Sequence, residues 1–275
     1  MTTAAPSITR LPGLRIANAY LIDGGPGARW LVDTGHAAER AALLWSLHRA
    51  GLRPSDLSGA VLTHRHSDHA GNAAFLQRRG VKIFAHRADA EVLAGRAHRH
   101  RLKGDENSPW MARVFASMEN LMPAQLEVDA ALKHGEVVAG LEVHLVAGHT
   151  EGSLFLRHQQ AKALFSGDTL LNAVPPLTWE QRLCLPYGTF CVDREQALRG
   201  LAAFHRQGPA YEALMPGHGP VVLGGARGKV LAFLEKSGVW SRRGQVHPLS
   251  RFAGVSPRPA ATQLPDAWRT TARSD

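Results

Sequence analysis

The sequence has 275 residues, of which 44% are hydrophobic, and it contains no long unbroken run of apolar residues. This length is enough for one sizeable core, and a transmembrane helix is excluded because it needs about eighteen or more consecutive apolar residues. The formal net charge of +9 first suggests nucleic acid or an anionic substrate as a partner.

The N-terminus and the cysteines bear on localisation. Residues 1–12 lack a basic segment followed by an apolar one, so the sequence predicts no secretory signal. Two cysteines, Cys184 and Cys191, do not make a disulfide framework, and we expect both to be free thiols. We therefore expect a cytoplasmic protein that does not enter a membrane.

The first fifty residues are expected to form two strands and a helix. The strands, 14–22 and 29–32, flank a turn rich in glycine, and apolar residues at helical spacing predict a helix over 37–50. Asp33 follows the second strand. A carboxylate there either caps a turn or supports a metal-binding loop, and both interpretations are open.

The next segment is the densest in metal-binding residue types. It lies between an expected strand and an expected helix, over 59–62 and 70–79. Side chains at i and i+2 of an extended chain face the same side, so His64 and His66 can converge on one ion. Asp68 and His69 lie at the turn and are free to face a second ion. Histidine and carboxylate are the ligands expected for zinc, with iron or manganese as alternatives.

A helical insertion is expected around 87–122, after a short strand over 81–85 that is followed by His86. For His86, a helix cap is the preferred interpretation over contact with a substrate. Inserted helices sometimes cover one side of a site and more often only pack, so Trp110 and Phe115 are minor candidates for a pocket.

Three later strand ends repeat one design, in which a histidine or aspartate follows a short apolar run on a turn rich in glycine or other small residues. They are His149 after 141–146, Asp168 after 162–165 and His218 after 213–215. Glycine at such a turn lets the backbone approach a ligand closely. We expect these strand ends and the His64–His69 loop to meet on one rim.

The seven residues then supply the ligands of two ions. Three nitrogens bind the first ion, from His64, His66 and His149. The second ion is bound by Asp68, His69 and His218. Asp168 can bridge the two. Each ion still lacks one ligand, which a shared water or hydroxide can supply, and such an open position is typical of a catalytic site.

Five blocks of this sequence resemble those of the metallo-β-lactamase superfamily and occur in the same order. They are Val32-Asp33-Thr34-Gly35, Thr63-His64-x-His66-x-Asp68-His69-x-Gly71, Gly148-His149-Thr150, Ser166-Gly167-Asp168-Thr169 and Gly217-His218-Gly219. The resemblance implies an α+β fold, a four-layer αβ/βα sandwich of two mixed β-sheets with helices on the outer faces. It also implies that the seven residues bind two metal ions, which we expect to be Zn²⁺.

The resemblance further implies a dinuclear metal-dependent hydrolase, in which hydroxide held by the metals attacks a carboxylic ester, a thioester or a lactone. Asp68 is the expected catalytic residue, because its carboxylate can take the proton of the nucleophile and pass it to the leaving group. Two alternatives remain open on the same site. One is a phosphodiesterase or nuclease, and the other is a persulfide dioxygenase with a single iron.

This sequence differs from particular subfamilies at several motif positions, and the differences narrow the range of candidate substrates. True β-lactamases of the superfamily have no aspartate at the position of Asp168, so hydrolysis of these antibiotics is disfavoured. Glyoxalase II and the persulfide dioxygenases carry a glycine- and arginine-containing stretch where this chain has the apolar segment 170–176. Acyl-homoserine lactonases typically place a tyrosine where this chain has Leu171, and Tyr187 is a candidate substitute.

The chain is expected to divide into a metallo-β-lactamase-fold domain, 1–240, and an extension rich in arginine and proline, 241–275. The extension holds six arginines and two aspartates, so 6 − 2 = +4 of the net charge of +9 belongs to it. This composition favours a solvated extension over an arm that contacts phosphates. Nucleic acid is therefore a disfavoured partner that stays open, a small-molecule substrate is expected, and a homodimer stays open.

Overall fold

Two mixed β-sheets form the centre of the protein in the computed structural model, which describes residues 7–239 except 26, 105–106 and 175–179. The first sheet contains, in spatial order, β1 (Ile8–Arg10), β2 (Tyr20–Asp23), β3 (Arg29–Val32), β4 (Leu57–Val61), β5 (Lys82–His86) and β6 (Ala130–Leu132). The second contains β11 (Ala213–Pro216), β10 (Ala163–Gly167), β9 (Leu154–His158), β8 (Leu141–Leu145) and β7 (Val137–Val138). Parallel pairing joins β3 to β4, β4 to β5 and β5 to β6 in the first sheet, and β10 to β11 in the second.

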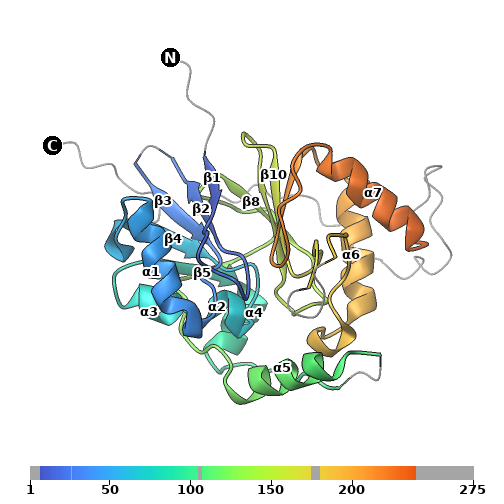
Figure 1. Ribbon diagram of the computed structural model, residues 1–275, viewed down its shortest axis with the longest axis horizontal. Helices are drawn as coiled ribbons and strands as arrows, with labels where there is room; N and C mark the ends of the chain where they lie inside the picture. The colour runs from blue at the N-terminus through green and yellow to red at the C-terminus, as the bar shows by residue number, and fades with distance from the viewer. Residues whose placement is uncertain (1–6, 26, 105–106, 175–179, 240–275) are drawn as a thin grey trace.

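Helices lie on the outer sides of the two sheets, with α1 and α3 beside the first and α6 and α7 beside the second (Figure 1). The α-helices are α1 (Arg40–Arg49), α2 (Ser67–Ala70), α3 (Ala73–Gln77), α4 (Arg87–Leu93), α5 (Trp110–Leu121), α6 (Arg194–Arg206) and α7 (Ala226–Lys236). Short 3-10 turns are η1 (Ala37–Glu39), η2 (Pro54–Asp56) and η3 (Gly188–Phe190). The expected four-layer αβ/βα sandwich is confirmed.

The core has three layers because both sheets are buried on both faces. In β9, Leu154 and Leu156 pack in the central layer between the sheets, whereas Phe155 packs outward under α6 and α7. Alternate residues of a strand point to opposite faces, so an unbroken apolar sequence is what a strand buried on both sides requires. Tyr20 and Phe165, from different sheets, meet edge to face in the central layer with ring centroids 5.2 Å apart.

The strand expected over 14–22 is wrong in its first part. Only Tyr20–Asp23 is extended and paired, and Ile8–Arg10 supplies the neighbouring strand instead. The segment just before β2 instead binds a loop that is distant in the sequence. Asn18 donates hydrogen bonds from Nδ2 to the carbonyl oxygens of Pro216 and Gly219, both at 2.8 Å. These contacts hold the turn that carries His218.

The helix expected over 70–79 is interrupted, and the interruption shapes the site. A Cβ at Gly71 would lie 2.3 Å from the carbonyl oxygen of Ser67 and 2.6 Å from the backbone nitrogen of Ala37. Only glycine fits such an approach. The Asn72 side chain then donates to the carbonyl oxygens of Thr34 at 3.0 Å and His36 at 2.9 Å. The break between α2 and α3 therefore packs the end of β3 against the His64–His69 loop.

The expected helical insertion contains α4 and α5, and α5 lies along the lower edge of the sandwich in Figure 1, across both halves of the molecule. Among the described residues, none of the helices combines the length and apolar character needed to cross a membrane. Cys184 and Cys191 are both free, as expected. The extension 241–275 lies outside the described residues.

Candidate metal centre

The structure brings all seven predicted ligand residues together at one edge of the sandwich. Their donor atoms form two groups, within each of which all atoms lie within 4.8 Å of one another. The first group is His64, His66 and His149, and the second is Asp68, His69, Asp168 and His218. The residues come from the ends of β4, β8, β10 and β11. Strands of two different sheets therefore converge on one polar cluster.

The first group consists of neutral imidazoles. Burial lowers the pKa of His64 and His66 well below the ordinary histidine value, and lowers the pKa of His149 to about 4. The Nε2 atoms of His64 and His149 lie 3.2 Å apart. Nε2 of His66 is buried and has no hydrogen-bond partner among the described residues. Neutral imidazole is the form that binds a metal, so three lone pairs are available here.

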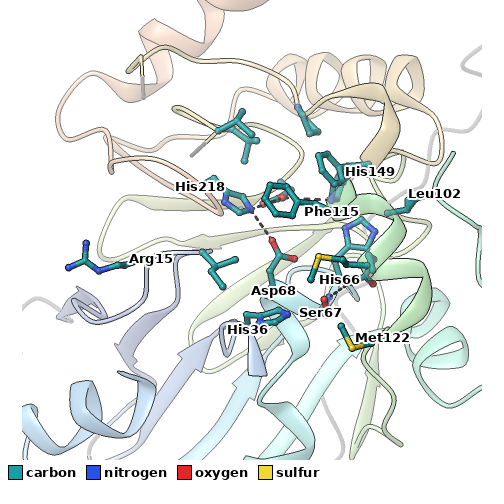
Figure 2. A pocket seen from close by; sticks show the side chains of 18 residues that line it. Arg15, His36, His66, Ser67, Asp68, Leu102, Phe115, Met122, His149 and His218 are labelled. Carbon is teal, nitrogen blue, oxygen red and sulfur yellow. Dashed lines mark hydrogen bonds and ion pairs between the residues drawn. The ribbon is translucent and has the colours of Figure 1, made fainter. Parts of the chain in front are cut away.

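The second group combines two carboxylates with two histidines. Nε2 of His218 lies 3.1 Å from Asp68 Oδ2 and 3.2 Å from Asp168 Oδ2 (Figure 2). Burial alone would lower the pKa of His218, but the carboxylates of Asp168 and Asp68 outweigh it and raise this pKa to about 10. The carboxylates thus favour positive charge at this position, and a divalent cation supplies that charge in place of protons.

Asp168 faces both groups. Its Oδ1 lies 3.1 Å from His69 Nε2, while its Oδ2 lies 3.8 Å from His149 Nε2 in the first group. The donor set of nitrogens and carboxylate oxygens, with the unsatisfied His66 Nε2, fits two divalent cations held side by side. These residues are therefore consistent with a dinuclear metal site, and they leave the identity of the metal open.

Asp33 supports the metal-binding loop, which decides between its two interpretations. Its Oδ2 lies 2.8 Å from His69 Nδ1, and its Oδ1 accepts a hydrogen bond from the Thr63 backbone nitrogen at 2.7 Å. A carboxylate on Nδ1 holds the proton there and leaves Nε2 of His69 free to face the second group. Asp33 itself has a positive φ of 61°, an uncommon conformation outside glycine.

We expect Asp33→Asn to weaken metal binding about 10- to 100-fold. The amide must place its NH₂ either against His69 Nδ1 or against the Thr63 backbone N–H, and the first choice reverses the tautomer of His69. Asp129→Asn is the matched control, since Asp129 binds Gln77 and Lys82 away from the site. Competition with a fluorescent chelator measures the affinity, and equal values for the two variants would contradict the role of Asp33.

Asp89 joins two metal-binding loops, and the sequence analysis missed it. The carboxylate is fully buried, and its Oδ2 accepts from the Arg65 backbone nitrogen at 2.9 Å and from Thr150 Oγ1 at 2.7 Å. Its other oxygen accepts from the Gly152 nitrogen at 2.9 Å. The backbone at Gly152 approaches Asp89 so closely that a Cβ there would lie 2.6 Å from Asp89 Cγ. Only glycine fits at this position.

Arg65 is the cation that accompanies Asp89. Its side chain is 1% exposed, and its guanidinium lies 3.6 Å from Asp89 Oδ1 and 2.7 Å from Glu151 Oε2. Burial raises the pKa of Asp89 to about 6, while Arg65 and the hydrogen bonds limit the rise. Asp89 is therefore ionised at neutral pH. One buried ion pair ties the His64–His66 loop to the loop that carries His149.

A cavity of about 440 Å³ opens beside the metal-binding residues (Figure 2). Apart from the predicted ligands its lining is mostly apolar, from Ile16, Leu102, Phe115, Met118, Met122, Leu171, Val174, Pro186 and Phe190. The other lining residues are Arg15, His36, Ser67 and Glu119. Phe115 thus lines a pocket as predicted, whereas Trp110 is 67% exposed and does not line this one. Tyr187 is likewise not among its lining residues.

Two further histidines near the site cap helical turns. His86 caps α4, where its Nδ1 accepts from the Ala88 nitrogen at 3.2 Å, as predicted. His36 does the same for η1 through the Ala38 nitrogen, also at 3.2 Å, and it borders the cavity. Neither belongs to the two groups of metal-binding residues.

Comparison with known proteins gives one family and relatives with related activities. A family model described as "Metallo-beta-lactamase superfamily" matches residues 12–218. An acyl-coenzyme A thioesterase of Bos taurus is 30% identical over 251 residues, which cover 85% of this chain and 78% of the bovine protein. A hydroxyacylglutathione hydrolase of Jannaschia sp. is 29% identical over 170 residues, which cover 61% of this chain and 53% of that protein. The solved structure of a metallo-beta-lactamase family protein from Thermus thermophilus is similar with a TM-score of 0.57 and 25% identity, covering 85% of this chain and 79% of that one.

Proposed function

The chain belongs to the metallo-beta-lactamase superfamily, and from that premise we propose that it uses two bound Zn²⁺ ions to hydrolyse a small carboxylic ester, thioester or lactone. Among these, the thioester is the first choice. Both relatives compared above carry the names of thioester hydrolases, although the match spans only 53% of the Jannaschia protein. The free thiols of Cys184 and Cys191 support a reducing compartment, the cytoplasm, as part of the proposal.

The observation that carries the proposal is the apolar cavity beside the metal-binding groups. Ligand sites typically combine an apolar lining with a few convergent polar groups, and here those groups are the candidate metal ligands. Of the lining residues that the structure describes, Arg15 is the only arginine or lysine. A polyanionic phosphodiester would find little charge to neutralise it, so the cavity favours an acyl substrate over nucleic acid.

Two cations bound at the seven residues would supply the chemistry of such a site, by lowering the pKa of water and polarising the carbonyl oxygen of the substrate. Asp68 is placed to move the proton. Its side chain is 25% exposed, it lines the cavity, and His218 lies 3.1 Å away and fixes its orientation. Burial raises the pKa of Asp68, but the neighbouring His69 and His218 outweigh it, so the carboxylate is ionised and able to accept a proton.

Elemental analysis of the purified protein, run beside a substrate panel, tests this function. The panel contains an acyl thioester, a glutathione thioester, an aryl ester, a lactone, a phosphodiester and a β-lactam. We expect about two zinc ions per chain, turnover of the thioester or ester, and loss of that turnover after chelation with recovery on adding Zn²⁺.

Other outcomes would overturn the proposal. One iron per chain with oxygen consumption on a persulfide would indicate the dioxygenase. Turnover of the phosphodiester alone would indicate the phosphodiesterase. A protein purified in zinc-containing medium that retains little or no metal would contradict the metal-binding role of the seven residues.

A further inference from the structure

Helix α5 presents an apolar stripe to the cavity. Phe115 and Met118 of α5 and Met122, the residue that caps its C-terminal end, recur at helical spacing and all line it. They are nevertheless 37%, 44% and 63% exposed. With Ile16, they account for four of the eleven large hydrophobic side chains that are exposed among the described residues. Scattered exposed side chains are ordinary, but a contiguous set around one cavity marks a binding surface.

Polar contacts, rather than this apolar stripe, hold α5 in place. Glu119 Oε2 accepts a hydrogen bond from the Ser67 nitrogen at 3.0 Å, directly beside the metal-binding residues. Asn120 binds both backbone groups of Leu102, at 2.9 and 2.8 Å. The small residues of the helix, Ala112 and Ala116, are the buried ones. The stripe therefore stays available to something other than the protein core.

The rest of the cavity lining has the same character. Leu171 and Val174 follow the Asp168 turn, and Phe190 ends η3. Among the described residues, apart from the predicted metal ligands, Arg15 and Glu119 are the only arginine, lysine or carboxylate residues that line the cavity, and Glu119 accepts a hydrogen bond from Ser67. A polar or charged acyl group would lose water here and find few polar groups to replace it, which is unfavourable.

We propose that α5 and the other apolar residues of the cavity lining form a binding site for an extended apolar acyl chain, with Phe115, Met118 and Met122 as the residues that determine chain-length specificity. The inference rests on the proposed hydrolysis and names its substrate class. The scissile carbonyl lies at the edge formed by Asp68 and His218, and the alkyl chain runs from there along the stripe. Binding the chain removes apolar surface of both partners from water, and this is the source of affinity.

Binding of straight-chain carboxylates tests the site without any turnover. The probes are butanoate, hexanoate, octanoate and decanoate, titrated into the metal-loaded protein by calorimetry below their micelle concentrations. The head group is constant, so the series isolates the chain. We expect the affinity to rise about fourfold per added methylene, which corresponds to about 0.8 kcal/mol, until the cavity is filled. A negative heat-capacity change of binding should grow with chain length.

Met118→Asp and Leu121→Asp form a matched pair of variants. Both place a carboxylate on α5, but Met118 lines the cavity, whereas Leu121 is 77% exposed and does not. We expect Met118→Asp to flatten the dependence on chain length and Met118→Leu to retain it. Leu121→Asp should behave as the parent protein. A steep dependence that survives in Met118→Asp would overturn the placement of the chain on α5.

Aryl esters of the same chain lengths separate this inference from the proposed hydrolysis. A rise of kcat/KM with chain length, parallel to the affinities, supports both. Turnover that is independent of chain length, with flat binding, overturns the acyl-chain site and leaves the hydrolase intact. Binding that depends on chain length, without turnover of any ester or thioester, supports the site and refutes the hydrolysis.

Discussion

Asp68→Ala should lower kcat/KM on the order of 10² to 10⁴-fold, the usual range for removing a general acid–base group. The reason is that this carboxylate has two tasks. It is one of the four donors of the second group, and its exposure to the cavity lets it exchange a proton with a substrate. Steady-state kinetics on the best substrate of the panel measures the loss. Activity near that of the parent protein would refute the mechanism.

Asp68→Asn separates the two tasks. An amide oxygen can still face a cation, but the amide cannot accept the proton of the nucleophile. We therefore expect Asp68→Asn to retain most of its metal by elemental analysis and still to lose turnover. If metal and turnover fell in parallel, Asp68 would act only as a ligand.

His66→Ala should also abolish most turnover, through metal content. It deletes one of three neutral nitrogens of the first group, and no other residue of that group can replace it. About one metal equivalent per chain should be lost. His134→Ala is the control, because His134 is exposed, accepts a hydrogen bond from the Leu145 nitrogen and belongs to neither group of metal-binding residues. An unchanged metal content in His66→Ala would contradict the two-group arrangement.

Asp89→Ala should destabilise the protein by about 3–5 kcal/mol, because it leaves the buried Arg65 guanidinium without the one of its two counter-charges that is itself fully buried. Three further donors, the backbone nitrogens of Arg65 and Gly152 and the hydroxyl of Thr150, lose their acceptor at the same time. Unfolding in urea with metal present, followed by circular dichroism, measures the free energy of unfolding.

Glu91→Ala serves as the control for Asp89→Ala on the same helix. Glu91 forms an exposed ion pair with Arg96, and exposed pairs contribute little to stability. We expect its unfolding midpoint to stay close to that of the parent protein. Equal midpoints for the two variants would show that Arg65 is stabilised by Glu151 alone, and that the contact between the two loops is dispensable.

Several local features were predictable because each depends on residues only a few positions apart. Asp193 precedes α6, and its Oδ1 accepts from the Gln196 nitrogen at 2.8 Å, as a helix cap must. Gly51, with φ of 73°, lies directly after α1 and its cap residue Ala50. The strands before His64, Asp168 and His218 were predicted to within a few residues of their ends, because apolar runs and glycine-rich turns mark such ends directly.

Other features failed or were missed because their causes lie far away in the chain. The strand expected over 14–22 begins only at Tyr20, because Asn18 before it binds Pro216, which is 198 residues away in the chain. The helix expected over 70–79 breaks where Gly71 packs against Ala37. Nothing near Asp89 in the sequence indicates that it is buried with Arg65, since burial is a property of the assembled fold.

The sequence by itself determined the family, the fold class and the seven candidate ligands. All three can be recognised from residue types and their spacing within short sequence blocks. Only the tertiary structure decided the distances between the ligand atoms of the two groups, that Asp33 orients His69, and that α5 turns an apolar stripe toward the cavity. The physical reason is that donor geometry, buried charge pairs and cavity walls are set by contacts between segments that the chain keeps far apart, and no local pattern encodes those contacts.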